Sequence, residues 1–161
     1  MSNVPRQKNF DPEKFAGLWY ELSRSEFIPF HKGDLTTWEF TPNADGTIQI
    51  KHTTTMKNGN TIANEALARK LLNAKYSISG QGWFKRTFPN DINVVETDYN
   101  SYAILVSKPW FEFWKLPYAW MLTRKAEIER SYIRHLNYKL QEKGGISSYI
   151  MRETKQQAGS A

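Results

Sequence analysis

Few side chains in this sequence have the types and spacing that catalysis or metal binding requires. The chain has no cysteine, which excludes disulfides, thiolate zinc sites, redox CxxC motifs and a cysteine nucleophile. Its three histidines, His31, His52 and His135, are far apart, and the sequence has no metal-ligand spacing and no nucleophile elbow. Glu21 and His52 are the remaining acid–base candidates. These residue types favour a binding protein without a cofactor or a metal, and they leave an enzyme as the alternative.

Aromatic residues are concentrated in three segments that the pattern of strands leaves as loops at one end. These segments hold six of the nine phenylalanines and three of the six tryptophans, namely Phe27, Phe30, Trp83, Phe84, Phe88, Trp110, Phe111, Phe113 and Trp114. Basic residues such as Lys85 and Arg86 accompany them. Aromatic side chains beside basic ones suit a membrane–water interface or an amphipathic anionic ligand. The alternative is that the loops fold over this end and pack as a lid.

The charge of the chain does not indicate a nucleic-acid partner. There are 22 basic and 16 acidic side chains, which give a formal net charge of +6. Eight basic residues lie between positions 124 and 155, but four glutamates interrupt them. The sequence has no RNP motif, no zinc finger and no continuous basic helix. We therefore interpret most of the excess charge as a solvated surface.

The elements that must position these residues are short strands. A length of 161 residues suggests one domain, running from 1 to 161. From about 15 to 124, short segments alternate between polar and apolar residues and are separated by turn residues such as Asp45-Gly46. After a first strand at Gly17, the segments cover 35–41, 47–56, 61–72, 74–79, 92–98, 101–107 and 118–123. The segment 61–72 also has helix propensity, but its neighbours favour a strand. Eight strands predict an antiparallel sandwich or barrel.

The C-terminal part of the chain has a different periodicity. Apolar residues recur every four positions at Ile128, Tyr132, Leu136 and Leu140, which predicts an amphipathic helix over 125–142. Thr123 is a candidate cap at its start, and two glycines at 144–145 suit its end. We expect a short final strand over 146–151 and a loose tail over 155–161.

Three motifs in this order resemble those of the lipocalin family. Gly17-x-Trp19 opens the first strand, Thr97-Asp98 is followed by Tyr102 between two late strands, and Trp120-Met121-Leu122-Thr123-Arg124 precedes the helix. The resemblance covers residues 10 to 151 and is strongest to the branch of bacterial outer-membrane lipocalins and apolipoprotein D. It implies an all-β fold, an eight-stranded antiparallel up-and-down β-barrel with one C-terminal α-helix packed outside.

The resemblance also implies roles for the motif residues. In lipocalins the late arginine lies across the tryptophan of the first motif, so we expect Arg124 to stack on Trp19 at one end of the barrel. Thr97 and Asp98 are expected to fix a tight turn at the same end. Gly17 and Tyr102 are the remaining residues of these structural motifs. These roles are structural and do not identify a ligand.

Alternation along each strand predicts which side chains line the cavity of such a barrel. With Trp19 placed inward, the candidates are Trp38, Phe40, Ile48, Ile50, His52, Tyr102, Ile104, Val106, Trp120 and Leu122. A barrel of eight strands holds one small ligand or is filled by its own side chains. Ordinary barrel-filling core is therefore the alternative for each of these residues. We interpret His52 as a lining residue rather than a metal ligand.

The resemblance and the aromatic segments together predict a carrier of a small hydrophobic ligand, a fatty acid or a lysophospholipid. Basic residues in the aromatic segments would pair with its carboxylate or phosphate, and the end of the barrel that carries these segments would contact a membrane surface. The alternatives are a lipid-modifying, isomerase-like enzyme that uses Glu21 and His52, and an interaction module with a filled barrel.

The chain shows no signal peptide, lipobox cysteine or spanning segment. If a leader has been removed, we expect an extracytoplasmic or membrane-associated protein, and otherwise a cytoplasmic one. Oligomeric state and ligand identity stay open.

Overall fold

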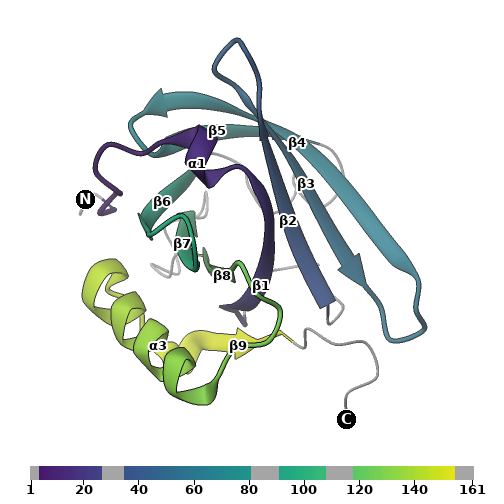
Figure 1. Cartoon of the computed structure of the whole chain (residues 1–161), viewed down its shortest axis with the longest axis vertical. Helices are drawn as coiled ribbons and strands as arrows, with labels where there is room; N and C mark the ends of the chain where they lie inside the picture. Colours follow the sequence, from purple (N-terminus) through teal and green to yellow (C-terminus); the bar gives the residue numbers. More distant parts are fainter. Residues whose placement is uncertain (1–3, 27–34, 81–90, 108–117, 155–161) are drawn as a thin grey trace, which may run out of the picture.

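The strands of this chain close into an antiparallel barrel with one helix on its outside (Figure 1). The computed structural model describes residues 4–26, 35–80, 91–107 and 118–154. The strands follow the order β2-β3-β4-β5-β6-β7-β8-β1-β9, and an additional pairing of β1 with β2 closes the barrel. Its elements are α1 (Pro12–Phe15), β1 (Gly17–Ser25), β2 (Leu35–Pro42), β3 (Ile48–Thr55), β4 (Thr61–Leu72), β5 (Lys75–Gly80), β6 (Asp91–Thr97), β7 (Tyr102–Ser107), β8 (Tyr118–Thr123), α3 (Arg130–Gly144), η2 (Ser148–Ile150) and β9 (Met151–Glu153).

The first hairpins form as the turn residues predict. Between β2 and β3, the Asp45 side chain accepts a hydrogen bond from the backbone N–H of Thr47 at 3.0 Å, and Gly46 has a φ of +88°. A residue with a side chain rarely adopts that backbone conformation. The ambiguous segment Thr61–Leu72 is a strand, as favoured above. It pairs with β3 over eight consecutive positions, and this pairing outweighs its helix propensity.

The C-terminal helix starts later than its periodicity predicts. It begins at Arg130 rather than near 125, with Glu129 at the N-cap position. Thr123 does not cap it, because its hydroxyl donates to the carbonyl of Lys125 at 2.7 Å. The helix ends as expected at glycine, with Gly145 at a φ of +65° and its N–H bonded to the carbonyl of Gln141. In the described parts of the chain, no helix has the length and apolar character needed to cross a bilayer.

The final strand is shorter and lies later than expected. Residues 148–150 form the 3-10 turn η2, and β9 covers only Met151–Glu153 rather than 146–151. It pairs with the second half of β1, from Ser23 to Ser25, whereas the first half of β1, from Gly17 to Tyr20, pairs with β2. The wall beside the second half of β1 is therefore completed by the C-terminal strand.

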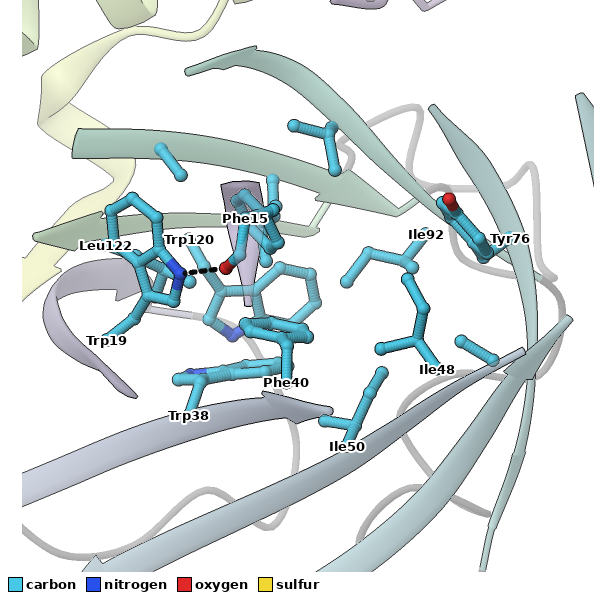
Figure 2. Packing of buried hydrophobic residues seen from close by; sticks show 14 of the residues in the cluster. Phe15, Trp19, Trp38, Phe40, Ile48, Ile50, Tyr76, Ile92, Trp120 and Leu122 are labelled. Carbon is cyan, nitrogen blue, oxygen red and sulfur yellow. Dashed lines mark hydrogen bonds between the residues drawn. The ribbon is translucent and has the colours of Figure 1, made fainter. Parts of the chain in front are cut away.

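Two hydrophobic cores lie on the two faces of this sheet. The inner core fills the barrel and includes Phe15, Trp19, Trp38, Phe40, Ile48, Ile50, Ala66, Ala68, Tyr76, Ile92, Val94, Ala103, Leu105, Trp120 and Leu122 (Figure 2). The outer core joins α3 to the barrel wall through Leu22, Val95, Tyr102, Ile104, Val106, Met121, Ile133, Leu136, Leu140 and Ile146. All six residues of β7 are buried, since both of its faces are covered.

Candidate ligand-binding site

A short N-terminal helix plugs one end of the barrel. Asp11 caps α1, because its Oδ1 accepts hydrogen bonds from the backbone N–H groups of Glu13 and Lys14 at 3.0 and 3.3 Å. This cap places Phe15 inside the barrel, with its ring centroid 5.1 Å from that of Trp19 and 4.8 Å from that of Phe40. This plug was not predicted from the sequence, although Asp11 followed by proline at the first helical position is a helix-start signal.

Arg124 fastens the plug to the barrel. Its guanidinium carbon lies 3.8 Å from the ring centroid of Trp19, which confirms the stacking implied by the motifs. Its Nη1 donates to the carbonyl of Leu18 at 3.0 Å, and its Nε donates to that of Tyr99 at 2.9 Å. Three further carbonyls, those of residues 14, 15 and 16, accept from its Nη2 at 3.2, 3.3 and 3.0 Å. Gly17 lies beside this guanidinium with a φ of +101°, a backbone conformation that residues with a side chain rarely adopt.

The second motif fixes the turn between β6 and β7, as expected. Asp98 Oδ1 accepts from the backbone N–H groups of Asn100, Ser101 and Tyr102 at 3.1, 2.8 and 3.1 Å. The Thr97 hydroxyl donates to the carbonyl of Tyr102 at 2.7 Å. Partial burial raises the pKa of Asp98, but the hydrogen bonds from the Ser101 hydroxyl and from these three N–H groups hold it below its usual value.

We expect Asp98→Asn to reduce stability at neutral pH by about 1 kcal/mol, because the amide oxygen can still accept the hydrogen bonds but hydrogen bonds to a charged carboxylate are stronger. A carboxyl whose pKa is lower in the folded state stabilises the fold above its unfolded pKa, and loses this effect as the pH falls through the folded pKa. The difference between variant and wild type should therefore shrink on acidification. Urea unfolding measured from pH 7 to pH 3 checks this, and a difference that is constant across the series would contradict it.

Seven of the ten cavity candidates face the inside of the barrel. Trp38, Phe40, Ile48, Ile50, Trp120 and Leu122 belong to the inner core. His52 shares the inner face of β3 with the isoleucines, and its ring centroid lies 4.9 Å from that of Trp38 in an edge-to-face arrangement. These side chains come from β2, β3 and β8, which alternation assigned correctly.

The prediction for β7 was wrong. Tyr102, Ile104 and Val106 lie on the outer face under α3, and Ala103 and Leu105 point inward instead. Lys139 of α3 places its Nζ 5.4 Å from the centroid of the Tyr102 ring. Alternation could not orient this strand, since apolar residues occupy both of its faces.

The plugged end of the barrel leaves little free space. A cavity of about 20 Å³ remains among Phe10, Phe15, Phe40, Ile48, Ile50, Ala68, Tyr76, Ile92, Val94 and Leu105. This volume is close to that of a single water-sized probe and is far below that of a typical ligand pocket. Any ligand of ordinary size must therefore extend toward the opposite end, which we call the mouth. The aromatic and basic candidates of the mouth segments lie outside the described residues.

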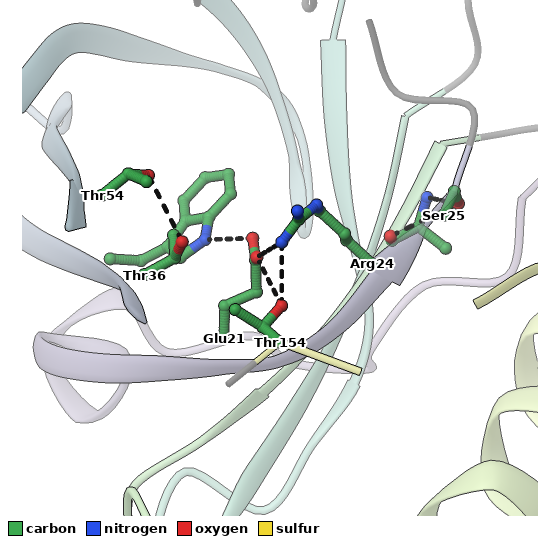
Figure 3. Close-up of polar contacts among 8 residues, drawn as sticks. Glu21, Arg24, Ser25, Thr36, Thr54 and Thr154 are labelled. Atoms are coloured by element: carbon green, nitrogen blue, oxygen red, sulfur yellow. Dashed lines mark hydrogen bonds and ion pairs between the residues drawn. The ribbon is translucent and has the colours of Figure 1, made fainter. Parts of the chain in front are cut away.

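A buried polar network lies toward the mouth (Figure 3). Glu21 Oε2 accepts from Nη1 of Arg24 and from the hydroxyl of Thr154, both at 3.0 Å, and its Oε1 accepts from the indole N–H of Trp38 at 3.2 Å. The Thr154 hydroxyl also accepts from Arg24 Nη1 at 2.9 Å. Glu21 is thus engaged in an ion pair and two further hydrogen bonds, which gives no support to its assignment as an acid–base group.

Sequence reasoning missed Arg24 and Thr154. Strict alternation from Trp19 places Glu21 and Ser23 inward and Arg24 outward, but a register shift between Glu21 and Ser23 reverses the faces of β1. Thr154 reaches the network from the far end of the chain, since its N–H bonds to the carbonyl of Leu22 at 2.8 Å. No local pattern signals either event.

The comparison with protein families decides the classification. The family model described as a lipocalin-like domain matches residues 10–156. This chain belongs to the lipocalin family. It is 29% identical to apolipoprotein D of Rattus norvegicus over 138 residues, which are 83% of this chain and 71% of that protein. It is 31% identical to apolipoprotein D of Macaca fascicularis over 133 residues, 79% of this chain and 67% of that protein.

Solved structures support the lipocalin fold. Lobster apocrustacyanin A1 superposes with a TM-score of 0.72 at 17% identity, over 96% of this chain and 91% of that chain. The cockroach allergen Per a 4 gives 0.73 at 16% identity, over 98% and 94%. Lipocalins typically bind small hydrophobic ligands, and the apolipoprotein D homologues are binding and transport proteins. This chain therefore belongs to a family whose members typically bind small hydrophobic ligands.

Proposed function

We propose that this lipocalin carries a single-chain amphipathic lipid, a fatty acid or a lysophospholipid. The main support is the polarity of the inner face, which changes along the barrel. On β3, the inward residues Ile48 and Ile50 near the plug are followed by His52 and Thr54 toward the mouth. An apolar chain in the inner part with its polar group toward the mouth matches this gradient.

Native mass spectrometry and titration with a fluorescent fatty acid test this proposal. We expect co-purified lipid in the mass spectrum and a dissociation constant in the micromolar range or below, because burial of an alkyl chain contributes roughly 0.8 kcal/mol per methylene group. The absence of both signals would overturn the proposed function.

We propose further that the mouth of the barrel contacts a membrane, so that the lipid can be transferred. An exposed tyrosine beside the mouth end of β1 supports this proposal. Tyr149, in η2, is 94% exposed, and η2 lies beside the end of β1, where the backbone N–H of Glu26 donates to the carbonyl of Ile150 at 2.9 Å. β1 leads into the first aromatic segment. An exposed tyrosine is a typical residue of a membrane interface.

Flotation with liposomes checks the membrane contact. We expect wild-type protein to float with vesicles that contain anionic lipid, and we expect the double variant Trp110→Ala/Trp114→Ala to float at least about fivefold less, because interfacial binding scales with buried aromatic area. Tyr138→Ala is a matched control, since Tyr138 is 64% exposed on α3. Unchanged flotation of the double variant would remove these tryptophans from the contact, and no flotation of wild type would exclude it.

A further inference from the structure

We propose that the mouth half of the barrel binds an uncharged hydrogen-bonding group of the ligand, such as a hydroxyl or an ester, and that it disfavours a carboxylate at that depth. The inference rests on the proposed lipid-carrying function and specifies the chemistry of the bound group. Its basis is a set of inward-facing polar residues on β1 to β4, which we call the polar arc: Glu21, Arg24, Thr36, His52, Thr54 and Asn64.

The register of the strands places the polar arc on one wall. Trp38 pairs with His52, which pairs with Asn64, and Thr36 pairs with Thr54 one level nearer the mouth. The hydroxyl oxygens of Thr36 and Thr54 are 3.3 Å apart (Figure 3). The other inward residues, on β5 to β8, are mostly apolar, namely Ile78, Val94, Leu105, Trp120 and Leu122, with the rings of Tyr76 and Tyr118 among them. A ligand in the barrel would therefore meet hydrogen-bonding groups mainly on β1 to β4 and mainly hydrocarbon on β5 to β8.

Filling of the barrel does not explain the polar arc. The side chains of Glu21 and Arg24 are 0% and 5% exposed, and Thr36 is fully buried. Replacing a buried ion pair by apolar residues of similar volume is often neutral or stabilising. A barrel that only had to be filled would be at least as stable with hydrocarbon at these positions. We infer that these polar groups serve recognition.

The charges in the polar arc determine which group it accepts. The negative charge of Glu21 lies 3.0 Å from the guanidinium of Arg24, so this pair carries no net charge. A carboxylate at this depth would lose its hydration and would meet the charge of Glu21 as well as that of Arg24. A hydroxyl or an ester avoids both costs and can bond to threonine hydroxyls, which donate and accept. The charged group of a ligand, where it has one, should lie nearer to solvent than the polar arc.

A comparison of two lipids with the same chain tests this inference. Each lipid is titrated as a competitor against a bound fluorescent fatty acid, and its dissociation constant is measured. The titrations are made at pH 8, where dodecanoate is ionised and monododecanoylglycerol is uncharged. We expect wild-type protein to bind the glycerol ester about tenfold more tightly, which corresponds to ~1.4 kcal/mol. Glu21→Gln removes the negative charge but keeps an oxygen that can accept from Trp38. It should raise the affinity for dodecanoate about tenfold and change that for the ester less than threefold.

Glu39→Gln is the matched control, because Glu39 is exposed on the outer face of β2. It should leave the ratio of the two affinities unchanged. Wild-type protein that binds dodecanoate as tightly as the ester would overturn the inference, and so would the same ratio in Glu21→Gln as in Glu39→Gln. If Glu21→Gln does not fold, the wild-type ratio alone decides. Wild-type protein that binds neither these lipids nor the fluorescent fatty acid would overturn the proposed function itself.

Discussion

Arg124→Met is expected to lower the free energy of unfolding by about 2–4 kcal/mol, one of the two largest effects expected here. Methionine retains much of the hydrocarbon stem but loses every hydrogen bond from the guanidinium to the carbonyls at 14–16, 18 and 99. The stacking on Trp19 is lost as well. The expected loss is smaller than the sum of these contacts, since Arg124 is only half-buried and such contributions are not additive.

Urea unfolding followed by tryptophan fluorescence measures this effect. Arg124→Lys should recover less than half of the loss, because an ammonium group cannot reproduce the planar fork of donors. Arg134→Met, on the exposed face of α3, is the control and should change stability by no more than about 0.5 kcal/mol. Equal midpoints for Arg124→Met and Arg134→Met would show that the closed end does not depend on this arginine.

Glu21→Leu should destabilise the fold by about 3–5 kcal/mol, which is the usual cost of removing one partner of a buried ion pair. The substitution deprives Arg24, Thr154 and Trp38 of a common acceptor. It should also loosen β9 from β1, since Thr154 anchors the end of the chain to this carboxylate. Hydrogen exchange at the backbone N–H of Thr154 should accelerate more than exchange at the β3–β4 pairs.

A double variant separates the charge from the packing. Glu21→Leu/Arg24→Met replaces both charges with hydrocarbon, and we expect it to be more stable than Glu21→Leu alone by at least about 2 kcal/mol. Glu39→Leu, on the solvent side of β2, is the matched control for the single change. A double variant no more stable than Glu21→Leu would mean that packing of the glutamate stem, rather than its charge, holds this region together.

Local sequence patterns predicted the orientation of those strands that bury one face and expose the other. On β2 and β3, apolar and polar residues alternate, so Trp38, Phe40, Ile48 and Ile50 were placed inside correctly. The turns at Asp45-Gly46 and at Asp98 were predicted because short polar side chains bond to the backbone within two to four residues. The pairing of Trp19 with Arg124 came from the family motifs rather than from periodicity.

The wrong predictions have a tertiary cause. Tyr102, Ile104 and Val106 were assigned to the wrong face, because α3 covers the outside of β7 and leaves no polar residue to mark it. The start of the helix was placed too early, since Ile128 continues its apolar periodicity although the backbone becomes helical only at Arg130. In both cases, packing against another element favours an apolar side chain. Local periodicity alone then indicates the wrong face or the wrong helix boundary.

The sequence by itself determined the family, the order of the strands and the apolar character of the barrel, because motifs, turns and alternation depend on neighbouring residues. Only the tertiary structure decided what the mouth half of the barrel contains. The register shift in β1 turns Arg24 inward, and the docking of β9 brings Thr154 to Glu21 across 133 positions of sequence. A bulge and a long-range strand pairing are set by the closure of the whole sheet, so no local segment encodes the polar arc.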